Sequence, residues 1–194
     1  MGLCMGEHEV FLIDEIGGSV GNYAGEKVKK EFMKGSEKLT ADSSSREIAE
    51  WLKGAMERLD ALVDEETRIR IMEPLGYHCA DGGYPRKWID EAVEERKKYK
   101  NVDEFLEAKA EEWGYSREGD VVYHTISKPP PGGARCVCIG KGLPAEETMS
   151  RTYCLCSRGL VKRYWEEVLG KPLRVELVHS AISGAKECRF AIHL

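Results

Sequence analysis

Residues 157–194, SRGLVKRYWEEVLGKPLRVELVHSAISGAKECRFAIHL, contain the patterns from which the fold is predicted. Between Ser157, a common N-cap residue, and Gly170, apolar residues recur every three or four positions, as on the buried face of a helix. Two runs with β-branched and aromatic residues follow, residues 173–180 and 186–194, and a short glycine-containing turn separates them. The segment therefore predicts one helix followed by an antiparallel β-hairpin.

The first half of the chain carries helical patterns. Ser44 opens a capping box before a stripe of apolar residues, and Asp64 is a suitable cap for the next helix. That next helix is predicted to break where Pro74 and Gly76 interrupt the pattern, and the glycine-rich residues 17–27 predict a flexible loop. Further helices are predicted at residues 25–33, 44–63, 85–98 and 102–113.

The second half of the chain changes to short runs bounded by Gly or Pro. Besides the hairpin, these runs predict strands at residues 121–126, 134–139 and 151–156. We therefore expect an α+β fold, in which a helical part, residues 1–115, packs on a mostly antiparallel sheet from residues 120–194, with one helix crossing it. The length of 194 residues suits a single domain, residues 1–194.

Composition restricts the class of protein. The chain has 29 basic and 34 acidic residues, a net charge of −5, and no long basic run, so we expect no nucleic-acid partner. No stretch approaches 18 consecutive apolar residues and the first residues do not resemble a signal peptide, so we expect a cytoplasmic protein without a membrane partner. Seven cysteines without an export signal favour reduced thiols over a disulfide framework.

Two Cys-x-Cys pairs, Cys136/Cys138 and Cys154/Cys156, are the most unusual chemistry in the sequence. Residues two apart on a strand point to the same face, so paired strands would bring sulfur atoms together. Zinc commonly takes four tetrahedral thiolate or imidazole ligands. Because Cα atoms two apart on a strand are about 6 to 7 Å apart, one cysteine of each pair is expected to turn elsewhere.

Residues outside the pairs would then complete a metal site. The candidates are His78, Cys79, His179 and Cys188. Two other interpretations stay open, namely a reactive cysteine and plain packing of buried thiols as small apolar side chains.

The ending VELVHSAISGAKECRFAIHL, preceded by CLCSRGLVKRYWEEVLGKP, carries a resemblance to a known family. It resembles the carboxy-terminal signature of 4-vinyl reductase domains, small-molecule-binding modules related to sensor domains of aromatic-responsive activators and to a heme-nitric-oxide/Golgi-transport superfamily. The pattern is a Gly, then Cys four positions later, then Phe and an aliphatic residue: Gly184, Cys188, Phe190 and Ile192.

This resemblance implies a zinc site with ligands at Cys154 and Cys188. The family's two other ligand positions are Leu177 and Ser180 in this chain. A retained site therefore needs replacement ligands from Cys136, Cys138, Cys156 or Cys79. The resemblance also implies a possible homodimer, because related folds dimerise.

A broader pattern combines Gly-x-x-Cys-Ala at residues 76–80, Cys-x-Cys, and Tyr-Cys-x-Cys-Ser-x-Gly at residues 153–159. It is similar to uncharacterised prokaryotic Cys-rich proteins and, more loosely, to 2-amino-thiazoline-carboxylate hydrolase-like proteins. The second similarity implies hydrolysis of a small cyclic amidine by a metal-bound water or a cysteine nucleophile, with His78 as a base.

Together these observations predict a protein whose cysteine-rich site binds a metal, zinc above all, and/or a small-molecule ligand, in a sensor-like fold. The alternative is a small-molecule hydrolase. The sequence by itself does not decide whether the site is catalytic.

Overall fold

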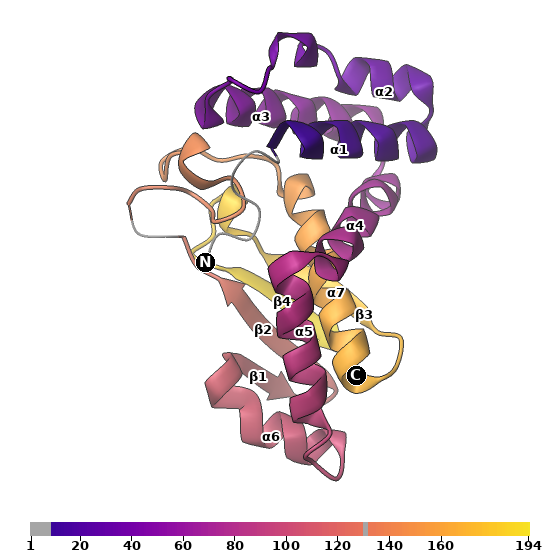
Figure 1. The fold of residues 1–194 in the computed structure, drawn as a ribbon, viewed down its shortest axis with the longest axis vertical. Coiled ribbons are helices and arrows are strands. Elements are labelled where there is room, and N and C mark those ends of the chain that lie inside the picture. The colour runs from indigo at the N-terminus through magenta and orange to yellow at the C-terminus, as the bar shows by residue number, and fades with distance from the viewer. Residues whose placement is uncertain (1–8, 130–131) are drawn as a thin grey trace.

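Helices form the first half of the chain, and an antiparallel sheet with one covering helix forms the second half, so the predicted α+β class is confirmed (Figure 1). The computed structural model describes residues 9–129 and 132–194. Its helices are α1 (Glu9–Ala24), α2 (Glu26–Phe32), α3 (Ser45–Leu62), α4 (Glu65–Asp81), α5 (Gly83–Arg96), α6 (Val102–Trp113) and α7 (Leu155–Leu169). Its sheet has the order β1-β2-β4-β3, formed by β1 (Tyr115–Glu118), β2 (Val121–Ser127), β4 (Cys188–His193) and β3 (Arg174–His179).

Side-chain caps mark the starts of α3 and α4 as predicted, and a cap is also present at the start of α6. At the start of α3, the Ser44 hydroxyl accepts a hydrogen bond from the backbone N–H of Glu47, and the Glu47 carboxylate accepts one from the backbone N–H of Ser44. Asp64 and Asn101 cap α4 and α6 with their side-chain oxygens. Each cap satisfies an N–H group without a partner inside the helix and contributes about 1 kcal/mol.

Residues 17–24 belong to α1, so the flexible loop predicted from this glycine-rich run is wrong. One face of the helix is buried at helical spacing: Ile13, Ile16 and Val20. A Cβ atom on Gly17 would lie 2.6 Å from Met33 Sδ, so this glycine permits close packing with the segment that follows α2. Burial of the apolar face outweighs the low helix propensity of glycine.

Helix α4 continues through Pro74 and Gly76, so the predicted break at these residues is wrong. The helix crosses α7 at very short range. A Cβ on Gly76 would lie 1.9 Å from the Cys156 carbonyl oxygen, and a Cβ on Gly159 would lie 2.1 Å from the Glu73 carbonyl oxygen. Both glycines are therefore explained by the crossing, where the two helix backbones are in contact.

Two of the predicted strands, residues 134–139 and 151–156, are wrong. Residues 134–139 form a loop with an isolated β-bridge between Ala134 and Pro144, and residues 151–156 form the 3₁₀ helix η3 (Arg151–Cys154) and the first turn of α7. The outer strand beside β2 is β1, whose short charged sequence gave no strand signal. A short run that alternates apolar and polar residues does not distinguish a strand from a buried loop.

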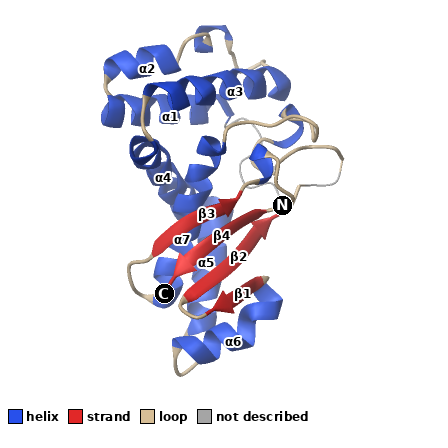
Figure 2. Ribbon diagram, turned by 180° about the vertical axis from the view of Figure 1, so that it is seen from behind, coloured by secondary structure: helices blue, strands red, loops and turns tan. Residues whose placement is uncertain are grey.

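Strand β4 lies between β2 and β3, antiparallel to both, which confirms the predicted hairpin. Helix α7 covers one face of this sheet, and α5 lies beyond α7 (Figure 2). The side chains that alternate toward the covered face are buried: Val122, His124, Val175, Leu177, Phe190 and Ile192. They join one hydrophobic core that extends from α1 to β4.

A histidine lies in the middle of this core. His124 of β2 is 4 % exposed, and its Nδ1 accepts a hydrogen bond of 3.2 Å from Nε1 of Trp165 in α7. The rings of Tyr115 and Tyr164 pack beside it. Burial lowers the pKa of His124 to about 4, although a hydrogen bond with the backbone of Trp113 acts in the opposite direction.

We expect His124 to make the stability of the protein fall in mild acid. The unfolded chain binds a proton at His124 near the ordinary pKa of 6.5, whereas the folded chain does so only at about 4, so the unfolding free energy declines as pH falls between these values. The contribution lost between about pH 7 and about pH 5 is about 2 kcal/mol. Denaturant unfolding of the wild type and of His124→Phe at both pH values measures it. If the unfolding free energy changed by the same amount between the two pH values in both proteins, His124 would not be the source of the acid sensitivity.

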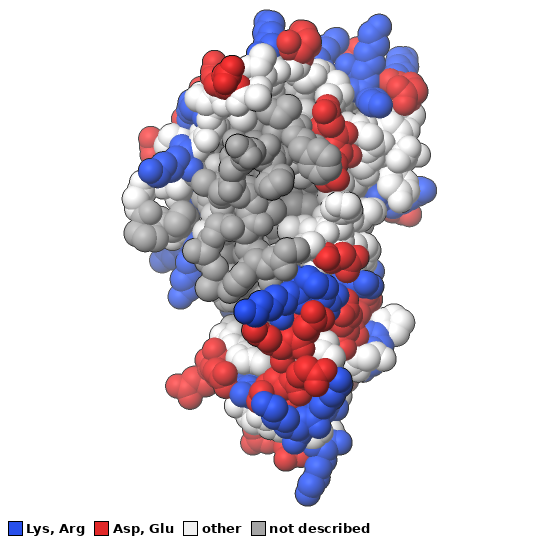
Figure 3. Space-filling model, in the orientation of Figure 1, with Lys and Arg blue, Asp and Glu red and all other residues white. Residues whose placement is uncertain are grey.

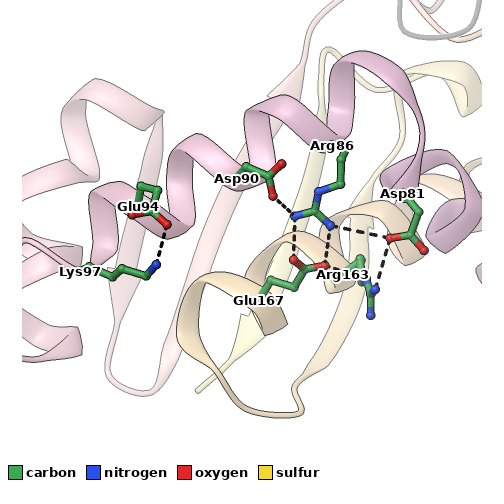
Figure 4. A network of polar contacts seen from close by, with 7 residues as sticks. All are labelled: Asp81, Arg86, Asp90, Glu94, Lys97, Arg163 and Glu167. Carbon is green, nitrogen blue, oxygen red and sulfur yellow. Dashed lines mark hydrogen bonds and ion pairs between the residues drawn. The ribbon is translucent and has the colours of Figure 1, made fainter.

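Ion pairs connect α5 to α4 and α7 (Figure 4). Arg86 donates two hydrogen bonds, of 3.0 and 2.7 Å, to the Glu167 carboxylate, and it also pairs with Asp90. Arg163 pairs with Glu167 and with Asp81 at the end of α4. Arg86 and Glu167 are about one quarter exposed, so the network fixes the helix orientation more than it adds stability.

Acidic and basic side chains are mixed on the face drawn in Figure 3, most densely over α5 and α6. Across the part of the chain that the structure describes, none of the helices has the length and apolar character needed to span a bilayer.

Candidate metal centre

Four cysteines from three segments of the chain lie together near the start of β4. Cys136 and Cys138 come from the loop after β2, Cys154 ends η3, and Cys188 is the first residue of β4. The Cys136 thiol is hydrogen-bonded to the thiols of Cys138 and Cys188, and the Cys154 thiol is hydrogen-bonded to that of Cys188. We call these four side chains the thiol cluster.

The loop that supplies two of the thiols is held at both ends. The backbone N–H of Arg135 donates to the Leu143 carbonyl at 2.8 Å, and that of Ala145 donates to the Gly133 carbonyl at 2.7 Å. The short 3₁₀ helix that follows packs on the start of α3, where a Cβ on Gly142 would lie 2.2 Å from a backbone oxygen of Ser45. These contacts fix the loop in place although it is not the predicted strand.

Cys154 and Cys156 point in different directions because they begin a helix. Cys154 is the N-cap of α7, which starts at Leu155, so the prediction that Ser157 caps this helix is wrong. At 3.6 residues per turn, side chains two positions apart diverge by roughly 200° around the axis. Cys154 joins the thiol cluster, while Cys156 Sγ donates to the Tyr153 carbonyl oxygen at 3.2 Å.

Hydrogen-bond donors surround the sulfur atoms of the thiol cluster. The backbone N–H of Cys138 donates to Cys136 Sγ and that of Ala181 donates to Cys188 Sγ, both at 3.4 Å. The Ser180 hydroxyl donates to Cys154 Sγ at 3.1 Å. Such donors stabilise a thiolate more than a thiol, and they are common around metal-bound sulfur.

The thiols are nevertheless in an environment that opposes ionisation without a cation. Cys136, Cys154 and Cys188 are 1 %, 2 % and 4 % exposed. Hydrogen bonds with neighbouring thiols, followed by burial, raise the pKa of Cys136 and of Cys154 far above 9. A nucleophilic cysteine needs the opposite shift, so the interpretation of these residues as reactive cysteines has no support here.

The remaining predicted site residues lie on other parts of the surface. His78 and Cys79 belong to the last turn of α4. The His78 imidazole is 73 % exposed, with Nε2 3.6 Å from Glu15 Oε1. His179 is exposed at the end of β3. Glu176 on the same strand lies opposite Ala191 and not opposite Cys188.

Two serines at the thiol cluster were not predicted as contributors. Ser180 was expected only as a position at which a ligand is missing, but its hydroxyl donates a hydrogen bond to Cys154 Sγ. Ser157 Oγ lies 4.0 Å from Cys138 Sγ. The family pattern pointed to Ser180 through its position, whereas no sequence signal marked Ser157 beyond its use as a cap.

A small cavity adjoins the cluster. A cavity of about 10 Å³ beside Cys138 is closed by α1, α3 and Tyr153, and it has room for about one water molecule. As the side chains stand, no set of three or more His, Cys, Asp or Glu residues within residues 9–129 and 132–194 is arranged around a metal position. The thiols instead contact one another directly.

A family model with the description "Family of unknown function (DUF6144)" matches residues 10–194. No curated protein and no solved structure matches the chain. The matched region contains all four residues of the thiol cluster.

Proposed function

Because the chain belongs to the DUF6144 family, whose function is unknown, we propose a function from its thiol cluster: the protein binds zinc as a structural part of a sensor-like domain. The ligands are the four thiolates of Cys136, Cys138, Cys154 and Cys188. The observation that carries the proposal is the convergence of four thiols, three of them nearly fully buried, from a loop, a helix start and a strand.

The sulfur–sulfur distances that a zinc ion requires are close to those between thiols that are already in contact. With Zn–S bonds of about 2.3 Å in a tetrahedron, neighbouring sulfur atoms lie roughly 3.8 Å apart. Thiols joined by hydrogen bonds have a similar separation, so small side-chain rotations would replace shared protons by a shared cation. Zinc would also stabilise the ionised sulfurs, which burial otherwise disfavours.

The resemblance to 4-vinyl reductase domains supports the same site. Its two expected ligands, Cys154 and Cys188, are in contact. The two ligands that this chain lacks, at Leu177 and Ser180, would be replaced by thiols of the loop after β2. The sequence left Cys79 and Cys156 open as replacements, and the contacts of Cys136 and Cys138 with the cluster favour the loop pair over these.

Four protein thiolates leave no coordination position for a substrate, which is typical of structural zinc. A hydrolase needs an open position or an ionised thiol beside a base. The raised pKa of the clustered thiols and the exposed position of His78 beside Glu15 give that alternative no support. The homodimer implied by the resemblance stays a prediction.

Zinc retention in single variants tests the ligand set. We expect Cys154→Ser and Cys188→Ser, purified without affinity metal, to retain less than about one third of the wild-type zinc, because three remaining sulfurs bind weakly. Cys156→Ser is the matched control, because the Cys156 thiol lies close to Cys154 in the chain but donates to the Tyr153 carbonyl oxygen. This variant should retain as much zinc as the wild type. Equal zinc in Cys154→Ser and Cys156→Ser would overturn the proposed ligand set.

A further inference from the structure

A groove of about 260 Å³ runs along the free edge of β3, between the start of α4 and the start of α7. Its volume is slightly below the roughly 300–1,000 Å³ of sites for drug-sized ligands, so it suits a smaller molecule. Apolar side chains from three elements form part of its lining: Ile69, Leu155, Val175 and Leu177. The rest of the lining is charged, with three arginines and two glutamates.

Two of the arginines are held in place by the strand edge. Arg158 Nε donates to the Val175 carbonyl oxygen at 2.6 Å, and Arg151 Nη2 donates to the Leu177 carbonyl oxygen at 3.0 Å. Outward-facing carbonyls of an edge strand are the groups to which a further strand would bind. Because both are already occupied, the groove does not suit an added β-strand, and a small ligand is the better occupant.

Guanidinium groups that are fixed in this way keep donors for a ligand. Each guanidinium has five N–H donors in a plane. Arg158 is 17 % exposed. Its Nε donates to the Val175 carbonyl oxygen and its Nη1 forms an ion pair with Glu73 Oε2 at 2.9 Å, while Arg151 Nη2 donates to the Leu177 carbonyl oxygen. A guanidinium with further N–H groups beside an apolar wall is suited to a carboxylate attached to an apolar body.

The charge of the lining favours a single negative charge on the ligand. Arg174 is already paired with Glu176 and Arg158 with Glu73, so among the described residues Arg151 is the guanidinium of the lining that forms no ion pair with a carboxylate and can attract one negative charge. We propose that this groove binds a small monocarboxylate with an apolar body. The proposal extends the sensor-like function proposed above by naming its ligand class, but it requires no bound metal.

Residues of the groove are close in sequence to residues of the thiol cluster. Leu155, which lines the groove, directly follows Cys154, and Leu177 lies three residues before Ser180, whose hydroxyl contacts Cys154. A ligand that displaces the start of α7 would therefore also displace Cys154 and change the geometry of the thiol cluster. This connection gives a physical route by which a sensor-like domain could link ligand occupancy to the metal site.

Calorimetric titration with a panel of simple probes tests the proposal. Acetate, hexanoate, benzoate and 3-phenylpropionate are compared with the neutral amides hexanamide and benzamide, and with inorganic phosphate. We expect saturable binding of at least one carboxylate with an apolar body, at a Kd of about 1 mM or below, and at least about tenfold weaker binding of its amide and of phosphate. No saturable carboxylate binding, or equal binding of acid and amide, would overturn the proposal.

Variants locate the binding and separate it from the metal. Arg151→Gln should weaken carboxylate binding about tenfold, and Arg151→Lys serves if that variant does not fold, because lysine keeps the charge but lacks the planar set of N–H donors. Arg117→Gln, on β1 beside Asp103, is the control and should bind like the wild type. Repeating the titration after zinc removal distinguishes the groove proposal from the zinc proposal. Carboxylate binding that persists without zinc supports the groove as the binding site, whether or not the protein binds zinc. An unchanged carboxylate affinity in both groove variants would refute the groove as the binding site.

Discussion

Replacing Gly159 by alanine is expected to destabilise the protein by about 3 kcal/mol or more, which lowers Tm by roughly 10 °C for a chain of this size. The added Cβ would lie 2.1 Å from the Glu73 carbonyl oxygen and 3.0 Å from the Glu73 carbonyl carbon. Both are backbone atoms of α4, so no side chain can rotate away to relieve the overlap. The α4–α7 crossing would have to open. Tyr164, which stacks on Trp88 of α5, and Trp165, which packs on Tyr115 of β1, would then lose packing.

A matched substitution separates this effect from helix propensity. Gly18 of α1 is also helical, but a Cβ there would meet nothing within 4 Å. Gly18→Ala should therefore stabilise the protein by about 0.5–1 kcal/mol. Thermal and denaturant unfolding of the two variants measures the change in stability caused by each substitution. If Gly159→Ala were as stable as Gly18→Ala, the close contact between α4 and α7 would be wrong.

Removing zinc from the wild-type protein is expected to produce the second large loss of stability. The thiol cluster connects a loop, η3 and β4, which are distant in sequence, so a shared cation would stabilise only the folded chain. At a free zinc concentration of about 1,000 times Kd, binding contributes about 4 kcal/mol, or a shift of about 10 °C in Tm. Melting the protein with zinc and with excess chelator measures the shift.

The cysteine variants give the control for this experiment. Cys188→Ser should melt at a lower temperature than the wild type with zinc, and chelator should then change its Tm by less than about 2 °C. Cys156→Ser should keep the full zinc-dependent shift. A chelator effect of equal size in Cys188→Ser and Cys156→Ser would mean that any metal binds elsewhere.

Local chemistry made much of the fold predictable. The caps at Ser44, Asp64 and Asn101 and the helical spacing after them depend on neighbouring residues, so the sequence reveals them directly. The glycines of α1 and α4 misled the prediction, because Gly17 and Gly76 serve contacts with residues far along the chain. A single sequence does not tell a glycine that ends a helix from one that lets two helices touch.

The membership of the thiol cluster was predictable only in part, because the predicted residues Cys79, Cys156 and His78 lie outside it, and its geometry was not predictable. Cys154 and Cys188 follow from the family pattern, and both lie in the thiol cluster. The strand argument placed each Cys-x-Cys pair on one face of a strand and expected one cysteine of each pair to turn elsewhere. Cys136 and Cys138 instead lie in a loop where both sulfur atoms turn to the same cluster, whereas Cys154 and Cys156 separate because they begin a helix.

Zinc analysis combined with X-ray absorption at the zinc edge, on full-length protein purified without affinity metal, tests the central claim most directly. The proposed site predicts about one zinc per chain with four sulfur neighbours at about 2.3 Å. Less than about 0.3 zinc per chain after purification in zinc-supplemented medium, or a shell in which nitrogen and oxygen replace two or more sulfurs, would contradict it.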